Sequence, residues 1–285
     1  MKMKYSISKC LIVVSYLTVC FPLSSPSQDK LQFLLSQTHT LQEKGDYLFA
    51  AKLYKFIASK TTDSIIMADA LYGFVTCGDR AADAFTVRHY TSETFHETGS
   101  ESTWTAELDP ILKRDIVNFA ELGIQLKLIN HFETYYVNVD TLTRQFLSKR
   151  FSNTSQGELA TFDLITNEVT SEGYPSFNNP HPVIERATAF LHHYPNSIYQ
   201  YDVFHILGRA FQDLWEFSRG SYADLLTEKE QANPDELRHE AIKHLKLAKD
   251  NRKKLVKLEW DVTSEDVFNN LKNKEDTNGY FYFGD

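Results

Sequence analysis

The ten histidines are the residues of this chain best suited to bind a metal ion or transfer a proton. His239 and His244 lie on one predicted helix, in the order His-Glu-Ala-Ile-Lys-His. A zinc-binding helix of the His-Glu-x-x-His type has its histidines four residues apart, so that both rings face one ion. A spacing of five turns the rings about 140° apart. We therefore expect a solvated helix face here.

A second group of histidines occupies one short stretch of sequence, at His181, His192, His193 and His205. These side chains could gather on a metal ion in the folded chain, but no cysteine accompanies them and their spacing matches no closed zinc site. We expect His192 and His193 to be partly exposed at the C-terminal end of a helix, where positive charge is favoured. The sequence predicts no metal site.

Candidate nucleophiles are equally sparse. The chain contains no Gly-x-Ser-x-Gly motif and no glycine-rich phosphate loop. Cys77 stands in an apolar helical stretch, which favours a buried, unreactive side chain. With 38 acidic residues, no pair of carboxylates stands out as a hydrolytic pair. We therefore predict no catalytic residue and no cofactor.

Aromatic side chains are densest between residues 194 and 222. Most should form core, because Phe204 and Phe211 share a predicted helix face with Leu207. Tyrosine and tryptophan also suit binding surfaces, since one end of the ring can remain in water. On this ground the candidate partner-binding residues are Tyr199, Tyr201, Trp215 and Tyr222.

The composition predicts helices to position these residues. Hydrophobic residues make up 42% of the chain and charged residues 24%, as in ordinary globular proteins. The 11 glycines and 8 prolines are too few for the many turns of a β-rich fold. From residue 31 onward, apolar residues recur at three- and four-residue steps. We therefore expect an all-α fold that can divide into two lobes.

Two stretches carry a recognisable helical-repeat pattern. In LQEKGDYLFAAKLYKFIA, Gly45 stands at a turn, Tyr47 follows it, and Ala50 precedes Tyr54 by four residues. The stretch FLHHYPNS is followed by FHILGRAFQDL and later by a partner helix, HEAIKHLKLAKDN. Both resemble the tetratricopeptide repeat (TPR). The second is similar to TPR-like bacterial envelope lipoproteins of the outer-membrane assembly type.

The resemblance implies a degenerate TPR-like α–α superhelix that binds a protein or peptide partner. Three similar junctions, beginning at Phe56, Phe146 and Phe190, each predict a helix end followed by a new helix start. Residues 107–136 are expected to form one long helix opened by Asp109-Pro110. A short helix over 262–271 is expected to be capped by Thr263 or Ser264.

The expected organisation is a signal peptide at 1–27, an N-terminal helical lobe with the TPR-like hairpin at 28–169, a proline-containing linker at 170–182, a C-terminal TPR-like lobe at 183–260 with an insertion at 216–238, and a short helix with an aromatic tail at 261–285. The first segment joins three lysines to an apolar stretch too short to span a membrane comfortably. An uncleaved anchor is the alternative. Lipoprotein anchoring at Cys20 is disfavoured, because Val19 stands where a small residue is required.

These features predict an exported scaffold, in the periplasm or at the cell surface, that mediates protein–protein interaction in the cell envelope. The net charge of −8 disfavours nucleic acid as a partner. No later segment is apolar enough to span a membrane after signal removal. The alternatives are a helical exported enzyme, a glycan-binding protein, and a structural subunit of an envelope complex.

Overall fold

The computed structural model describes residues 26–90, 110–130, 134–138, 140–170, 180–220, 224 and 226–274. The described chain is mostly helical, as predicted, with one two-stranded antiparallel sheet. It divides into two compact units, Met1–Gln156 and Gly157–Asp285. None of the described helices is both long enough and apolar enough to cross a membrane.

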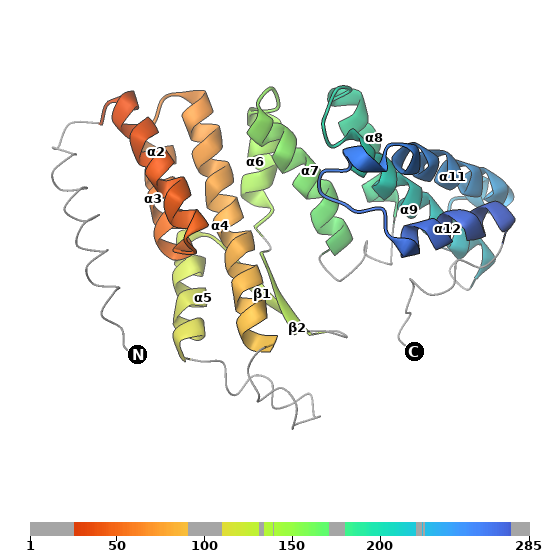
Figure 1. Ribbon diagram of the computed structural model, residues 1–285, viewed down its shortest axis with the longest axis horizontal. Helices are drawn as coiled ribbons and strands as arrows, with labels where there is room; N and C mark the ends of the chain where they lie inside the picture. The colour runs from red at the N-terminus through yellow and green to blue at the C-terminus, as the bar shows by residue number, and fades with distance from the viewer. Residues whose placement is uncertain are drawn as a thin grey trace. The chain divides into compact units, whose positions relative to one another are not determined.

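The first unit contains α2 (Gln28–Glu43), α3 (Tyr47–Lys60), α4 (Ser64–Tyr90), α5 (Pro110–Leu122), β1 (Leu126–Asn130), β2 (Thr134–Asn138) and α6 (Leu142–Arg150) (Figure 1). Helix α7 (Ser155–Thr170) crosses the boundary. The second unit continues with α8 (His181–His193), α9 (Gln200–Arg219), α10 (Glu228–Ala232), α11 (Pro234–Asp250), the 3₁₀ turn η3 (Arg252–Lys254) and α12 (Val262–Asn273).

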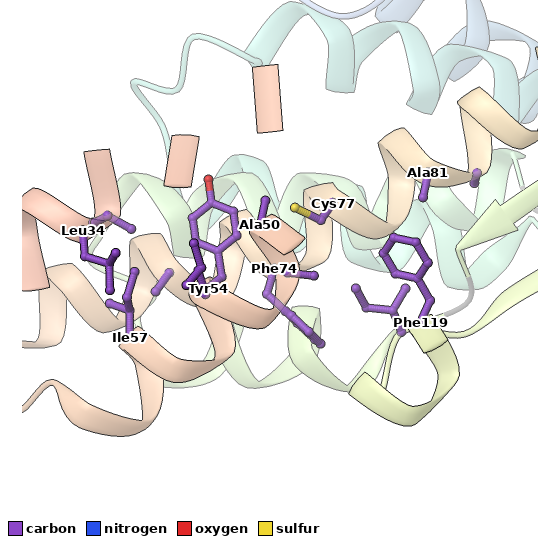
Figure 2. Close-up of a cluster of buried hydrophobic side chains, with 14 of the residues drawn as sticks. Leu34, Ala50, Tyr54, Ile57, Phe74, Cys77, Ala81 and Phe119 are labelled. Atoms are coloured by element: carbon purple, nitrogen blue, oxygen red, sulfur yellow. The ribbon is translucent and has the colours of Figure 1, made fainter. Parts of the chain in front are cut away.

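The predicted hairpin around Gly45 is confirmed as α2 and α3. Gly45 adopts a φ of +83°, a left-handed conformation that glycine reaches without strain. Ala50 and Tyr54 are both fully buried. The Tyr54 ring lies against Gly73 of α4, where an added Cβ would approach the ring to 2.5 Å. Figure 2 shows Tyr54 within the apolar cluster of this unit, near Cys77.

The prediction of one long helix over 107–136 is wrong beyond Leu122. Gly123 ends α5 in the left-handed region, with a φ of +96°, and the Ile124 N–H donates back to the Phe119 carbonyl at 3.0 Å. Strands β1 and β2 follow and pair in antiparallel register, with Leu126 opposite Asn138. The sequence Thr-Tyr-Tyr-Val-Asn of β2 is rich in residues that favour strands.

The second unit confirms the predicted pairing of two helices far apart in sequence. Helix α9 packs against α11, and Gly208 lies so close to Leu245 that an added Cβ would approach the Leu245 Cγ to 2.5 Å. The Pro195 junction also forms as predicted, because the Ser197 hydroxyl accepts the Tyr199 N–H at 3.0 Å. Both ends of the expected insertion at 216–238 are helical, since α9 runs to Arg219 and α11 begins at Pro234.

Two other boundaries differ from expectation. The unit boundary falls after Gln156, ahead of the predicted linker at 170–182, because Phe162 of α7 packs with Phe190 and Tyr199 in the second unit. Residues 171–179 of that linker lie outside the described residues. Helix α12 is capped by Asp261, whose carboxylate accepts the Ser264 N–H at 2.7 Å, and not by Thr263 or Ser264. Residues 1–25 of the expected signal peptide and residues 275–285 of the expected aromatic tail also lie outside the described residues.

Candidate partner-binding surface

Two of the four candidate partner-binding residues are not on the surface. Tyr199 is 8% exposed and stacks on Phe162, with ring centroids 4.9 Å apart. Trp215 is 4% exposed and has the Arg219 guanidinium 4.6 Å from its ring centroid. The expected surface position is therefore wrong for both, because Tyr199, just before α9, and Trp215, within α9, lie in the apolar core of the second unit. Tyr222 lies outside the described residues.

Tyr201 is partly exposed, beside a basic turn that the sequence prediction did not single out. The Lys254 ammonium lies 5.0 Å from the centroid of the Tyr201 ring and 3.4 Å from its hydroxyl. Next to Tyr201, the buried Asp202 carboxylate accepts backbone N–H groups from residues 256, 257 and 258. These bonds fix the segment after η3. The sequence did contain a signal for this basic turn, the run Asn-Arg-Lys-Lys-Leu-Val-Lys.

A second surface, also missed from the sequence, lies on α6 of the first unit. Leu142 is 76% exposed and Phe146 is 50% exposed, although both are large apolar side chains. They line an open hollow of about 420 Å³ together with Gln145, Lys149 and Arg150. Exposed apolar side chains that lie together beside polar ones are a feature of protein interaction sites. The hollow is therefore a candidate site for a partner.

The opposite face of α6 is joined to the rest of the first unit by an ion pair between the buried Arg144 and the partly exposed Asp79. Arg144 is 1% exposed, and its guanidinium donates to the Asp79 carboxylate at 2.5 Å and to the Asp140 carbonyl at 2.7 Å. Asn138 of β2 donates to the same Asp79 oxygen at 3.0 Å. The Asp140 carboxylate accepts the Thr143 N–H at 3.3 Å in the first turn of α6. This network joins α4, β2 and α6, so the outer face of α6 is held rigidly.

The charge of the hollow is positive. No carboxylate lines it, and neither Lys149 nor Arg150 has an acidic partner among the residues that the structure describes. Phe146 is held in place by an edge-on contact with Phe151, with ring centroids 5.8 Å apart. The surface thus combines a positioned aromatic ring with two cations that remain available to a partner.

One contact between a serine and a histidine resembles part of a hydrolase active site. His205 Nε2 lies 3.1 Å from the Ser264 hydroxyl oxygen, and burial lowers the pKa of His205 to about 4. In a catalytic triad the carboxylate orients the other imidazole nitrogen. Here His205 Nδ1 has no hydrogen-bond partner within the described residues, and Asp261 instead bonds to Ser264. Ser264 is only 4% exposed. The arrangement caps α12 and lacks the geometry of a nucleophile.

The remaining side chains that could react, a cysteine and three histidines, also occupy structural positions. Cys77 is buried, as predicted, and burial raises the pKa of its thiol to about 12. His192 and His193 are exposed at the end of α8, as predicted. His181 instead pairs with Glu230, with nitrogen and oxygen 3.0 Å apart. No group of three potential metal ligands occurs in the described part of the chain.

Helix α9 buries a further carboxylate, Asp213, within the second unit. The side chain is 2% exposed, and burial raises its pKa well above the usual value, with Glu216 adding to the shift and Arg209 opposing it. The role of Asp213, like that of His205, is therefore confined to the interior of this unit.

Scans against family models, curated proteins and solved structures found no match to this chain.

Proposed function

We propose that this chain is an exported TPR-like scaffold that mediates protein–protein interaction in the cell envelope. The observation that carries the proposal is the outer face of α6, where Leu142 and Phe146 stand exposed around a hollow. Phenylalanine and arginine are enriched in protein interfaces relative to the rest of the surface, and Phe146 and Arg150 both line this hollow. The buried network around Arg144 supports a binding role, because a rigid surface loses little entropy when a partner docks.

The helical hairpins support the scaffold part of the proposal. Gly73 of α4 against Tyr54 of α3, and Gly208 of α9 against Leu245 of α11, allow close helix packing, as small residues do in the repeat family that the sequence resembles. Repeats of this kind present extended surfaces to peptide segments and helices. The lysines and apolar stretch within residues 1–27 support export to the periplasm or cell surface.

Site-specific photo-cross-linking tests the proposal. A photoreactive phenylalanine analogue replaces Phe146 in the full chain, which is expressed in its own cells. The same analogue replaces Ser59, which is exposed on α3 away from the hollow, as the matched control. We expect irradiation to give discrete protein adducts from position 146 and none of the same mass from position 59.

Two results would contradict the proposal. Identical adducts from both positions would show random collisions. The absence of any protein adduct from position 146, together with specific retention of a glycan by the purified chain, would favour the glycan-binding alternative.

A further inference from the structure

We infer that the α6 hollow binds an acidic amphipathic helix of a partner protein, with two large apolar side chains one turn apart and carboxylates in the adjoining turn. This inference rests on the proposed scaffold function and identifies the chemistry of its partner. Three features of α6 carry it: the spacing of the exposed residues, their charge, and the rigidity of the helix.

The spacing of the exposed residues fits a helix. Leu142, Phe146 and Arg150 are four residues apart and form one ridge along α6, while Gln145 and Lys149 form the next. Helices pack by placing the ridge of one into the groove between two ridges of the other. The nine residues of α6 measure about 14 Å, which is long enough to contact two to three turns of a partner helix.

The charge of the hollow selects an acidic partner. Its apolar residues lie toward the N-terminal end of α6, and its two cations lie in the last turn. The chain has a net charge of −8, but the charged side chains that line the hollow are both positive. Carboxylates on the partner would complement Lys149 and Arg150, and lysines there would be repelled. The partner therefore carries its apolar pair and its carboxylates in neighbouring turns.

The inner face of α6 explains why the hollow can discriminate between partners. Leu147 is fully buried and Arg144 is bonded to Asp79, so α6 cannot rotate to hide its exposed side chains. A fixed aromatic ring and two cations at fixed spacing favour partners with a matching arrangement.

Binding of three synthetic peptides to the full chain tests the inference by fluorescence anisotropy. Each peptide has about 18 residues, long enough for a stable helix in alanine-rich sequence. The acidic peptide has two leucines four residues apart and glutamates in the next turn. The basic peptide replaces the glutamates with lysines, and the polar peptide replaces the leucines with serines. We expect measurable affinity for the acidic peptide alone.

Variants of the chain locate the binding. Phe146→Ala and the double variant K149E/R150E should each weaken binding of the acidic peptide about tenfold. The double variant should also bind the basic peptide weakly, because its charges are reversed. The matched control is K52E/K60E, which makes the same charge change at two exposed residues of α3 in the same unit. We expect this control to bind the acidic peptide as the native chain does.

Each contrary result has a distinct meaning. Equal binding of the acidic and basic peptides would overturn the charge preference and leave the scaffold function standing. An equal loss in K52E/K60E would show a general charge effect and overturn the assignment to α6. Failure of every peptide, with cross-linking from position 146 retained, would overturn the helical partner alone. Self-association that Phe146→Ala abolishes, measured by sedimentation velocity, would identify a second copy as the occupant. If no peptide bound and position 146 gave no cross-linked protein, the proposed function would be rejected as well.

Discussion

At the residue scale, the clearest determinants of this fold are positions where a side chain has no room. Gly208 lies between α9 and α11, and an added Cβ would meet Leu245 Cγ at 2.5 Å and the Leu245 backbone nitrogen at 2.9 Å. Because a backbone atom is among these neighbours, the contact cannot be relieved by a rotamer change alone. The helices would have to separate.

Gly208→Ala should therefore destabilise the second unit by about 1–3 kcal/mol, as overpacking does in well-packed cores. Gly220→Ala is the control, since its added Cβ would meet no atom of the described residues closer than 3.6 Å. Chemical denaturation followed by circular dichroism measures both. Equal stability of the two variants would show that α9 and α11 are less closely packed than described.

His39 provides a second prediction, about pH. Its Nδ1 lies 2.8 Å from the Tyr54 hydroxyl, which donates its own proton to Gln42 at 2.7 Å. His39 Nδ1 must therefore donate, and Nε2 lies 3.4 Å from the Asp69 carboxylate. The hydrogen bond with Asp69 raises the pKa of His39 above 6.5, and its effect outweighs the partial burial that opposes it. The doubly protonated ring is the form that satisfies both partners.

The stabilising effect of His39 should be fully present below pH 6.5, where the unfolded side chain is also protonated, and should be lost as the pH rises through the raised folded value. His39→Gln should therefore cost more stability at about pH 6 than at about pH 8. Urea midpoints of both proteins at the two pH values measure this difference. A larger cost at the higher pH would contradict the protonation assigned to His39.

At the scale of elements, helix ends proved easier to predict than the path of the chain between them. The junctions after α3, α6 and α8 lie where the repeated Phe-aliphatic and Asn/Asp-Ser pattern predicted them. At the first, the Asp63 carboxylate accepts the Ile65 and Ile66 N–H groups. Helix capping is local chemistry, and it can be read from a few residues. The change from α5 to β1 was missed because apolar spacing there fits either structure.

Asp202 fixes the segment after η3 through hydrogen bonds to its backbone. Asp202 accepts the Lys257 and Leu258 N–H groups at 2.8 Å each and the Val256 N–H at 3.1 Å. Asp202→Asn retains an acceptor oxygen but loses the charge, so it should destabilise the chain by about 2 kcal/mol, and Asp202→Ala by more.

Trypsin cleavage provides a local measurement of the same effect. Cleavage within residues 252–257 should accelerate in the order native, Asp202→Asn, Asp202→Ala. The control, Asp250→Asn, removes only the exposed pair with Lys246 and should leave the cleavage rate unchanged. Unchanged cleavage in both Asp202 variants would show that other contacts hold the segment.

At the scale of the whole molecule, each unit has its own hydrophobic core and its own buried charges. Arg144 is bonded within the first unit, and Gly208 sits in the second. We expect calorimetry of the full chain to show two transitions, with Arg144→Met lowering one and Gly208→Ala lowering the other. A single transition shifted equally by both variants would show that the units unfold together.

The sequence alone predicted the helical class, the two hairpins, the three junctions and the burial of Cys77. These follow from composition, capping and helical period, which are local properties. Only the tertiary structure showed that Tyr199 and Trp215 are buried while Tyr201 is partly exposed. It also revealed the α6 hollow, because α6 has apolar residues on both faces, with Leu147 inside and Phe146 outside. Helical period shows which side chains share a face, but which face is covered depends on distant residues, here Asp79 and Asn138.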